Sequence, residues 1–564
     1  MQNKYVKNLI SKMSLDQKIG AVLTLGFAGT VLRPHIIKNI VDYHCGGLRL
    51  SPTVRLFGSY VDPKTKKSIG NFVDTRGLKP GIVQPSCNAR EYSDMLTGLN
   101  QIAMDRPLGI PLHFSFDQEG GTSADYNFGG VKIFPKPMGI RATGDPGLAY
   151  EIAKAVSAQS KAVGFNWIHS PVLDVNTDPN NPEVYTRAYS DNPEEVAEYA
   201  IESCRGFKEA KMIATGKHFP GRGDSDIDAH FAVPTINVDR DTMLKRELYP
   251  YIELIKRDLL PSIMIAHSIF PAFDNKRIAT VSKAVLTGLL RDEMGFDGVI
   301  TTDSMTMGAL ANQYGVANAC ALSLEAGADL ILMKAENHLI EDTIEAIRGF
   351  ITSGRISETE LDNKVYRVLS TKYEYGMFTD FKKDDPIEVM NDEKIINISK
   401  TVARRSVVVD RAKDLPLAAN NKMLVIEQVN ITPNNVSWHP GILYKNCTKY
   451  NLQAEYLETT YTYDDDDKEA ILTAVEKHDC IVITNFYVRG RLSNNEFISE
   501  LVKNKSKKFV IVTNTPYPIS VPQGCDNIVV TYATSPDNIE VVAGVLFGKV
   551  IAGGEHPVKW ELKS

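Results

Sequence analysis

The chain has 564 residues and a net charge of −6, with 63 Lys and Arg against 69 Asp and Glu. Hydrophobic residues make up 43% and charged residues 23%, a balance typical of soluble globular proteins that excludes a disordered or fibrous chain. A chain of this length is expected to hold two or three domains. Its weak acidity disfavours binding to nucleic acid, and no apolar run reaches the roughly 18 residues of a membrane-spanning helix.

The first residues predict an amphipathic helix rather than an export signal. Tyr5, Val6, Leu9, Ile10 and Met13 recur at helical spacing, whereas a signal peptide needs an unbroken apolar stretch and a small-residue cleavage site. The seven cysteines are scattered and lack a CxxC pair, which argues against a disulfide framework and against a zinc site. We therefore expect a reducing, cytoplasmic location, with export left open if a signal was removed.

Residues 1–376 alternate short apolar runs with helical stretches such as 193–210 and 283–293. The runs are rich in Val, Ile and Leu without clear alternation, as strands buried on both faces should be. Repeated strand–helix units predict a parallel sheet, and eight of them indicate a (β/α)8 TIM-like barrel, with a doubly wound sheet as the alternative. The eight expected strands cover residues 21–24, 47–50, 111–116, 167–170, 212–215, 262–266, 298–302 and 329–333.

One connection in this first domain is unusually long. Residues 51–89 follow the second expected strand, so they should emerge at the C-terminal face of the barrel. Structureless loops of this length inside a compact domain are usually functional or disordered. Two interpretations stay open, a solvated insertion or a wall of the substrate cleft.

A linker is expected over residues 377–400, where a charged stretch containing Asp-Asp-Pro leads into a helix over 392–405. Residues 401–564 then predict a smaller α/β sandwich domain. Its last helix is expected to begin at Ser535 as N-cap, followed by Pro536. The expected strands are 406–409, 422–427, 480–484 and 509–513, and the expected helices are 467–477 and 535–547.

Two further patterns in the second domain concern ligands and surface. It lacks GxGxxG and any Walker-type loop, so nothing local supports nucleotide binding. Residues 464–468 read DDDDK, which we expect to form a solvated acidic turn.

Ionisable residues follow four of the expected barrel strands. Asp117 follows the third, residues 217–230 the fifth, His267 the sixth and Asp303 the seventh. The loops after barrel strands meet at one face, where active sites lie. Charged residues are rarely buried without a task, so their convergence favours function over ion pairs that merely close the barrel top.

Asp303 ends a buried strand, where a short carboxylate is rigidly held. Such a carboxylate can attack a carbon atom or stabilise a cation. Metal binding is the alternative, but no metal-ligand cluster is evident and no cofactor is expected. Basic neighbours such as Lys217 and Arg187 are expected beside it.

Asp228 and His230 form a short-range pair within the stretch 217–230. A carboxylate at this spacing can hold an imidazole, fix its tautomer and raise its pKa, so that the ring donates and accepts a proton near neutral pH. A lone D-x-H is usually no more than two polar surface residues. In a loop made mobile by Gly221 and Gly223, opposite a candidate nucleophile, it becomes a stronger signal.

Four stretches carry a family resemblance: KHFPGRGDSDIDAH, GVITTDSM, DQEGG and SPVLDVNTDPNNPEVYTRAYS. With them the chain resembles glycoside hydrolase family 3, in particular its β-N-acetylglucosaminidase branch in the two-domain form found in Gram-positive bacteria. The resemblance covers the first domain and extends to the end of the second, VVAGVLFGKVIAGGEHPVKW. It implies a retaining exo-β-N-acetylglucosaminidase that removes terminal β-linked GlcNAc from peptidoglycan fragments or chitooligosaccharides.

The resemblance also implies roles for single residues. Asp303 matches the nucleophile that forms a covalent glycosyl-enzyme, His230 the acid/base, and Asp228 its dyad partner. The residues that match substrate-binding positions are Asp117, Arg187, Lys217 and His218.

Two departures from the family pattern bear on the substrate. Thr122 stands where the family often has Arg after EGG, and residues 187–190 read RAYS where the family has Arg-Ser-Phe-Gly. A histidine acid/base also removes a negative charge from the cleft, which allows an anionic acceptor such as phosphate. The alternatives are therefore a β-glucosidase or β-glycoside phosphorylase on the same scaffold, or a non-catalytic sugar-binding relative. A carbohydrate is the expected partner, and the sequence gives no oligomeric state.

Overall fold

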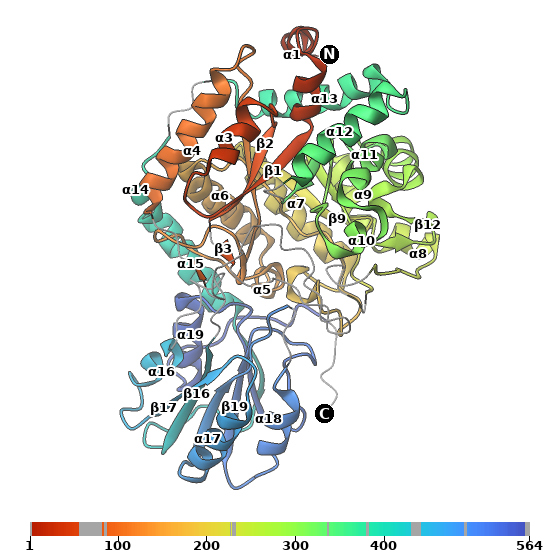
Figure 1. Ribbon diagram of the computed structural model, residues 1–564. Coiled ribbons are helices and arrows are strands. Elements are labelled where there is room, and N and C mark those ends of the chain that lie inside the picture. Colours follow the sequence, from red (N-terminus) through yellow and green to blue (C-terminus); the bar gives the residue numbers. More distant parts are fainter. Residues whose placement is uncertain are drawn as a thin grey trace.

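The first domain is a closed parallel barrel (Figure 1). Its strands are hydrogen-bonded in the order β13-β10-β9-β8-β5-β2-β1-β14, and a parallel bridge between Thr301 and Leu330 joins the two ends. This closure confirms the predicted TIM-like barrel over a doubly wound sheet. The structure, a computed structural model, describes residues 3–52, 54–55, 82–83, 87–225, 227, 233–334, 338–379, 383–429, 441–489 and 493–558.

All eight expected barrel strands are present, with ends that differ by a few residues. They are β1 (Leu23–Ala28), β2 (Gly47–Ser51), β5 (His113–Phe116), β8 (Trp167–Ile168), β9 (Ile213–Phe219), β10 (Ser262–Ile265), β13 (Val299–Thr302) and β14 (Ile331–Met333). Like β1, β9 continues four residues beyond its expected end and so includes Lys217 and His218. The reason is its pairing with β10, in which Met264 pairs with Lys217 and Ile265 with Phe219 across an irregularity.

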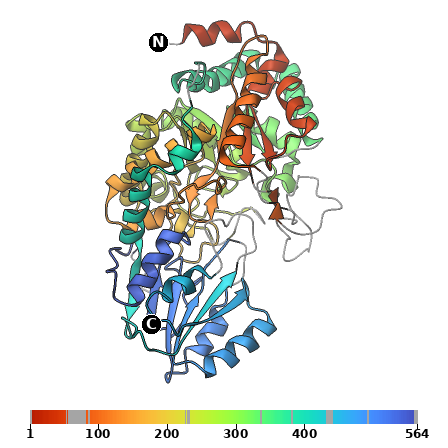
Figure 2. The same cartoon turned by 90° about the vertical axis from the view of Figure 1, so that its left-hand side faces the viewer.

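Helices cover the outside of the barrel (Figures 1 and 2). Their first turns follow ordinary capping rules: Asn88 and Glu91 form a capping box on α4, and Asn192 caps α7 directly before Pro193. The helices are α1 (Lys4–Ile10), α2 (Leu15–Ala21), α3 (Pro34–Val41), α4 (Ala89–Met104), α5 (Pro137–Ala142), α6 (Pro146–Val163), α7 (Pro193–Glu209), α8 (Arg240–Lys245), α9 (Tyr249–Lys256), the π-helix η3 (Ala284–Glu293), α10 (Gly308–Tyr314), α11 (Val316–Ala326), α12 (Leu339–Thr352) and α13 (Glu358–Glu374).

Among the described residues of the barrel domain, three antiparallel hairpins lie outside the barrel sheet. They pair β3 (Val54–Arg55) with β4 (Ile82–Val83), β6 (Gln118–Gly120) with β7 (Ser123–Ala124), and β11 (Ile269–Phe270) with β12 (Asp274–Ile278). The first hairpin belongs to the long insertion after β2. Most of that insertion lies outside the described residues, so its expected role at the cleft stays a prediction.

The second domain is a six-stranded sheet between two helical layers, in the order β15-β20-β19-β18-β16-β17. Only the pairing of β15 with β20 is antiparallel. Alternate residues of each strand face opposite cores: Ile481 and Ile511 pack with α17 and α18, whereas Val482 and Val510 pack with α16 and α19. The strands are β15 (Val408–Ala412), β16 (Met423–Val429), β17 (Glu455–Thr460), β18 (Cys480–Thr484), β19 (Lys508–Thr513) and β20 (Asn527–Val530), and the helices are α16 (Ile442–Cys447), α17 (Asp465–Glu476), α18 (Asn495–Leu501) and α19 (Pro536–Leu546).

We expected the acidic run DDDDK to form a turn, but it forms the start of a helix. Asp464 caps α17 in a capping box with Asp467, and the acidic residues fill the first turn of the helix. Carboxylates are favoured there because the amino end of a helix carries a partial positive charge. Ser535 caps α19 and Pro536 begins it, as predicted.

Two short helices connect the domains, α14 (Pro386–Met390) and α15 (Glu393–Ser406). The second packs on α5 and α6 of the barrel and on α19 of the sheet domain (Figure 1). We keep 377–400 as the proposed junction between the domains 1–376 and 401–564.

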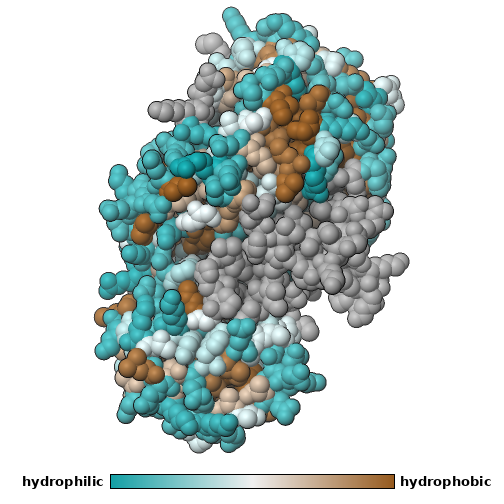
Figure 3. All heavy atoms as spheres, turned by 60° about the vertical axis from the view of Figure 1, so that its left-hand side comes forward, coloured by the Kyte–Doolittle hydropathy of each residue, from teal (hydrophilic) through white to brown (hydrophobic). Residues whose placement is uncertain are grey.

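Three further observations concern the polarity of the surface, the cysteines and the helices. The coloured part of the face in Figure 3 is mostly hydrophilic, with a few apolar patches. All seven cysteines fall in the described part of the chain and are free thiols. In that part no helix is both long and apolar enough to cross a lipid bilayer.

Candidate active site

Asp117 stands directly after β5 and pairs with two cations, Arg49 from the neighbouring strand β2 and Lys217 from β9, two strands away on the other side. The Nζ atom of Lys217 lies 2.8 Å from its Oδ1, and the guanidinium of Arg49 binds its Oδ2. Asp125 also holds Asp117 in place, because its Oδ2 accepts a hydrogen bond from the backbone N–H of Asp117 at 2.6 Å. Burial alone would raise the pKa of Asp117, but Lys217 and Arg49 outweigh it and hold the pKa well below its usual range. This carboxylate is therefore ionised and can accept hydrogen bonds from hydroxyl groups.

Glu119, two residues further on, shares Lys217 with Asp117. Its Oε1 lies 2.5 Å from Nζ of Lys217, and Arg187 grips both of its oxygens. Burial raises the pKa of Glu119, but the charges of Arg187 and Lys217 lower it to about 2. One lysine and one arginine thus lock two carboxylates of the DQEGG segment into a buried network. A fully satisfied network of this kind fixes its members in place.

His218 is held by a second buried carboxylate. Its Nδ1 lies 2.7 Å from Oδ2 of Asp174, and Arg187 approaches its Nε2 at 3.4 Å. Burial, followed by the charges of Arg222 and Arg187, lowers the pKa of His218 well below its usual value. The ring is therefore neutral, with its proton on Nδ1 facing Asp174 and a lone pair on Nε2.

Asp303 follows β13 and is half-buried. The backbone N–H of Ser304 donates to its Oδ1 at 2.7 Å, and its own N–H donates to the carbonyl of Ile265 on β10. Lys334, directly after β14, lies within electrostatic reach of both Asp303 and Asp117. The two carboxylates therefore share the mouth of the barrel, although they follow strands that are not neighbours in the sheet.

The structure brings five of the seven predicted site residues into one region: Asp117, Arg187, Lys217, His218 and Asp303. The remaining two, Asp228 and His230, lie outside the described residues. Lys217 and Arg187 were expected beside Asp303. In the structure Lys217 pairs with Asp117 and Glu119, and Arg187 pairs with Glu119, because the DQEGG segment folds back as the β6–β7 hairpin.

The first glycines of the stretch 217–230 are explained by packing rather than by mobility. A Cβ atom on Gly223 would lie 1.6 Å from the carbonyl oxygen of Val175, and one on Gly221 would lie 2.7 Å from Cβ of Glu247. The side chain of Asn181 also donates to the carbonyls of Arg222 and Gly223, each at 3.0 Å. The expectation that these glycines loosen the loop is therefore wrong for its first part, where the backbone is closely packed.

Several residues of the site were not selected from the sequence. Arg49, His169, Asp174 and Glu119 were missed, although three carried a usable signal. Arg49 is a charge inside the apolar strand β2, His169 follows β8 directly, and Glu119 lies in the DQEGG motif. Asp174 carried none beyond its place in the stretch SPVLDV.

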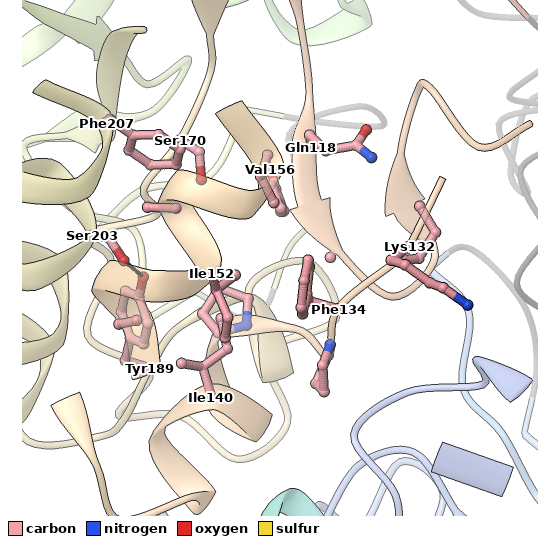
Figure 4. A pocket seen from close by; sticks show the side chains of 17 residues that line it. Gln118, Lys132, Phe134, Ile140, Ile152, Val156, Ser170, Tyr189, Ser203 and Phe207 are labelled. Carbon is pink, nitrogen blue, oxygen red and sulfur yellow. Dashed lines mark hydrogen bonds between the residues drawn. The ribbon is translucent and has the colours of Figure 1, made fainter. Parts of the chain in front are cut away.

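A small cavity lies on the helical side of the β6–β7 hairpin, and Glu119 is one of the residues that line it (Figure 4). Its lining is mostly apolar, with Phe134, Ile152 and Phe207 among the side chains, and the hydroxyls of Tyr189 and Ser203 hydrogen-bond to each other at 2.7 Å. It encloses about 30 Å³, room for a few water molecules and too little for a sugar ring. The cavity is therefore a small packing defect next to Glu119.

The described part of the chain has no group of three or more His, Cys, Asp or Glu side chains that could hold a metal ion. The carboxylates of the site are instead neutralised by lysine and arginine. This arrangement suits the binding of a polar neutral molecule by charged hydrogen-bonding groups.

Comparisons with known proteins find β-hexosaminidases among the similar sequences. The chain is 29% identical over 306 residues to the β-hexosaminidase A of Pseudoalteromonas piscicida, an alignment that covers 50% of this chain and 51% of that protein. It is 30% identical over 271 residues to a β-hexosaminidase of Methylococcus capsulatus, covering 48% of this chain and 79% of the relative. The chain thus spans about half the length of the first relative.

Similarity in structure extends over both domains. A solved glycoside hydrolase family 3 β-N-acetylglucosaminidase from Paenibacillus superposes with a TM-score of 0.85 and 27% identity, covering 98% of this chain and 100% of the other. Residues 63–371, more than half of the chain, match the N-terminal domain of glycosyl hydrolase family 3. The chain belongs to glycoside hydrolase family 3.

Proposed function

We propose that the protein is a retaining exo-β-N-acetylglucosaminidase that removes terminal β-linked GlcNAc from peptidoglycan fragments or chitooligosaccharides. The observation that carries the proposal is the position of Asp303, a carboxylate held at a strand end beside an ionised sugar-binding carboxylate, Asp117. The names of the two β-hexosaminidase relatives and of the Paenibacillus neighbour support the choice of sugar.

The reaction proceeds in two displacements at the anomeric carbon. In the first, a carboxylate oxygen of Asp303 attacks this carbon while the bond to the leaving oxygen breaks, and His230 donates its proton to that oxygen. In the second, His230 takes a proton from water, the water oxygen attacks the same carbon, and Asp303 leaves. Two inversions give net retention of configuration. Asp228 orients the imidazole in both steps.

The other residues of the site bind the terminal sugar. Asp117 is ionised and accepts hydrogen bonds from hydroxyl groups, whereas Lys217 donates to hydroxyl oxygens while it holds Asp117 in place. His218 is neutral and offers the lone pair of Nε2. Arg187 fixes Glu119 and lies against the same nitrogen of His218.

A comparison of aryl glycosides tests the proposal. Turnover of the GlcNAc glycoside well above that of the glucose glycoside, unchanged by phosphate, is the expected result. Preference for the glucose glycoside would indicate a β-glucosidase, formation of a sugar phosphate would indicate a phosphorylase, and binding without turnover would indicate a non-catalytic relative.

The nucleophile has its own test. A fluorinated GlcNAc glycoside that slows the second step should leave a covalent label, and peptide mapping should locate it on Asp303. A label on another residue would contradict the assignment. Proton NMR of the first product should show the β-anomer.

A further inference from the structure

Buried inside the barrel, His267 contacts the backbone that follows Asp303. It stands after β10, is fully buried, and places its Nε2 atom 3.0 Å from the carbonyl oxygen of Ser304. A carbonyl oxygen can only accept, so Nε2 carries a proton and donates it. The substrate-binding groups described above do not include this histidine, although it lies at a strand end beside them.

Two contacts fix the peptide group between Ser304 and Met305. Its carbonyl accepts from His267, and its N–H donates to the carbonyl of Leu332 on β14 at 2.9 Å. The peptide plane is thus held from both sides, by the strands that flank β13. With that plane fixed, the preceding N–H of Ser304 points at Oδ1 of Asp303, where it donates at 2.7 Å.

The other nitrogen of the ring is also occupied. Nδ1 lies 2.6 Å from Oγ1 of Thr280, and the same hydroxyl lies 3.0 Å from the carbonyl of Ala266. Thr280 contacts the imidazole on the side opposite to Ser304. The ring of His267 therefore links Thr280 to the Ser304 peptide group that orients the nucleophile, and we refer to this link as the strut.

We propose that His267 is a positioning residue for Asp303: through the Ser304 carbonyl it sets the backbone whose N–H holds Oδ1 of the carboxylate. This rests on the proposed function, in which Asp303 attacks the anomeric carbon. Covalent attack needs an oxygen aligned with that carbon to within a fraction of an ångström. Loss of the strut should therefore slow the chemical steps and leave sugar binding unchanged.

Two substitutions separate the two nitrogens of the ring. Gln reaches as far as Nε2 and can donate to the Ser304 carbonyl, whereas Asn reaches only as far as Nδ1 and cannot. H267N should lower kcat by about 100-fold with KM nearly unchanged, and H267Q should retain most of the activity. The rate at which the fluorinated glycoside labels Asp303 should fall in parallel with kcat, because that rate measures the attack itself.

His113 provides the matched control. It is also a fully buried barrel histidine with a threonine partner, its Nε2 lying 2.7 Å from Oγ1 of Thr24, but it contacts no part of the Asp303 segment that the structure describes. H113N and H113Q should change the melting temperature and leave kcat of the folded fraction unaltered. If H113N lowers kcat as much as H267N does, the effect is structural and the proposal is wrong.

Three other results would overturn it: wild-type labelling of Asp303 in H267N, equal losses in H267N and H267Q, or a raised KM with unchanged kcat. If H267N does not fold, H267S replaces it, since serine also lacks the reach to Ser304. The proposed function fails differently, because the wild-type protein would then show no turnover or carry the label elsewhere.

Discussion

The guanidinium of Arg187 holds the carboxylate of Glu119 by two parallel hydrogen bonds, Nε to Oε2 at 2.7 Å and Nη2 to Oε1 at 2.9 Å. Both side chains are buried, and Nη1 of the same arginine donates to the carbonyl of Glu183 at 3.1 Å. Glu183 in turn pairs with Arg489 of the second domain at 3.4 Å. The network around the sugar site therefore continues into the domain interface.

The first prediction concerns the shape of this arginine. Arg187→Lys keeps the charge but cannot donate two parallel bonds, so Glu119 loses part of its pairing in a buried place. We expect a lower melting temperature and a loss of at least about 10-fold in kcat/KM on the aryl GlcNAc glycoside. Steady-state kinetics and thermal unfolding of the same preparation measure both.

Arg141→Lys is the control for this prediction. Arg141 binds Glu195 through the same two-bond geometry, at 2.9 and 2.7 Å, between α5 and α7. Its loss should lower stability without changing kcat/KM of the folded enzyme. Equal kinetic effects in both variants would show that Arg187 acts only through stability.

The second prediction concerns the ionisation of Asp117. Lys217 is the first of the charges that lower the pKa of Asp117, so Lys217→Met should let this pKa rise. Asp117 must be ionised to accept hydrogen bonds from the sugar hydroxyl groups. The acid limb of the kcat/KM profile should therefore move to higher pH in the variant, on top of a general loss of activity. An acid limb that stays at the wild-type pH would show that Lys217 does not control the ionisation of Asp117.

The barrel strands could be predicted closely because each is buried on both faces and forms an uninterrupted apolar run. The strand β17 was missed for the opposite reason. It lies at the edge of its sheet, and only one of its residues EYLETT is buried, so no apolar run marks it. The strand β20 was also missed, although its four residues NIVV are all buried.

The candidate site was predictable as a set of residues but not as a set of pairs. Asp117 and Asp303 could be found because they follow strands, and strand ends of a closed barrel meet at one face. The partners of Lys217 could not, because they depend on how the DQEGG segment folds back as a hairpin. Arg49 pairs with Asp117 across neighbouring strands far apart in sequence, and only the barrel order reveals that neighbourhood.

The third prediction concerns stability and pH at Glu247. This side chain is fully buried, and burial raises its pKa from 4.5 to about 6 although Arg246 opposes the shift. The folded protein therefore holds the proton more tightly than the unfolded chain. As pH rises from 4.5 to 6, the unfolded chain loses its proton first, and the free energy of unfolding decreases. The full cost above this range is about 2 kcal/mol.

Glu247→Gln should remove that cost. The variant should be more stable than wild type above pH 6 and nearly equal to it below pH 4.5, measured by denaturant unfolding across this range. Glu253→Gln is the control of opposite sign, because Arg257 and Lys256 lower the pKa of Glu253. It should be less stable than wild type at neutral pH. A Glu247 variant that follows the Glu253 pattern would contradict the prediction.

The last prediction concerns the proton donor, His230. In the first displacement the need for an acid depends on the leaving group, because a nitrophenolate leaves readily without a proton whereas a sugar alkoxide does not. His230→Ala should therefore lose far more activity on a GlcNAc disaccharide than on the nitrophenyl glycoside. Asp228→Ala should show the same bias more weakly, since the imidazole remains but is poorly oriented. Rates on both substrates for the two variants give the comparison. If His230→Ala keeps wild-type rates on both, the acid/base is another group, and a carboxylate of the second domain becomes the first residue to substitute.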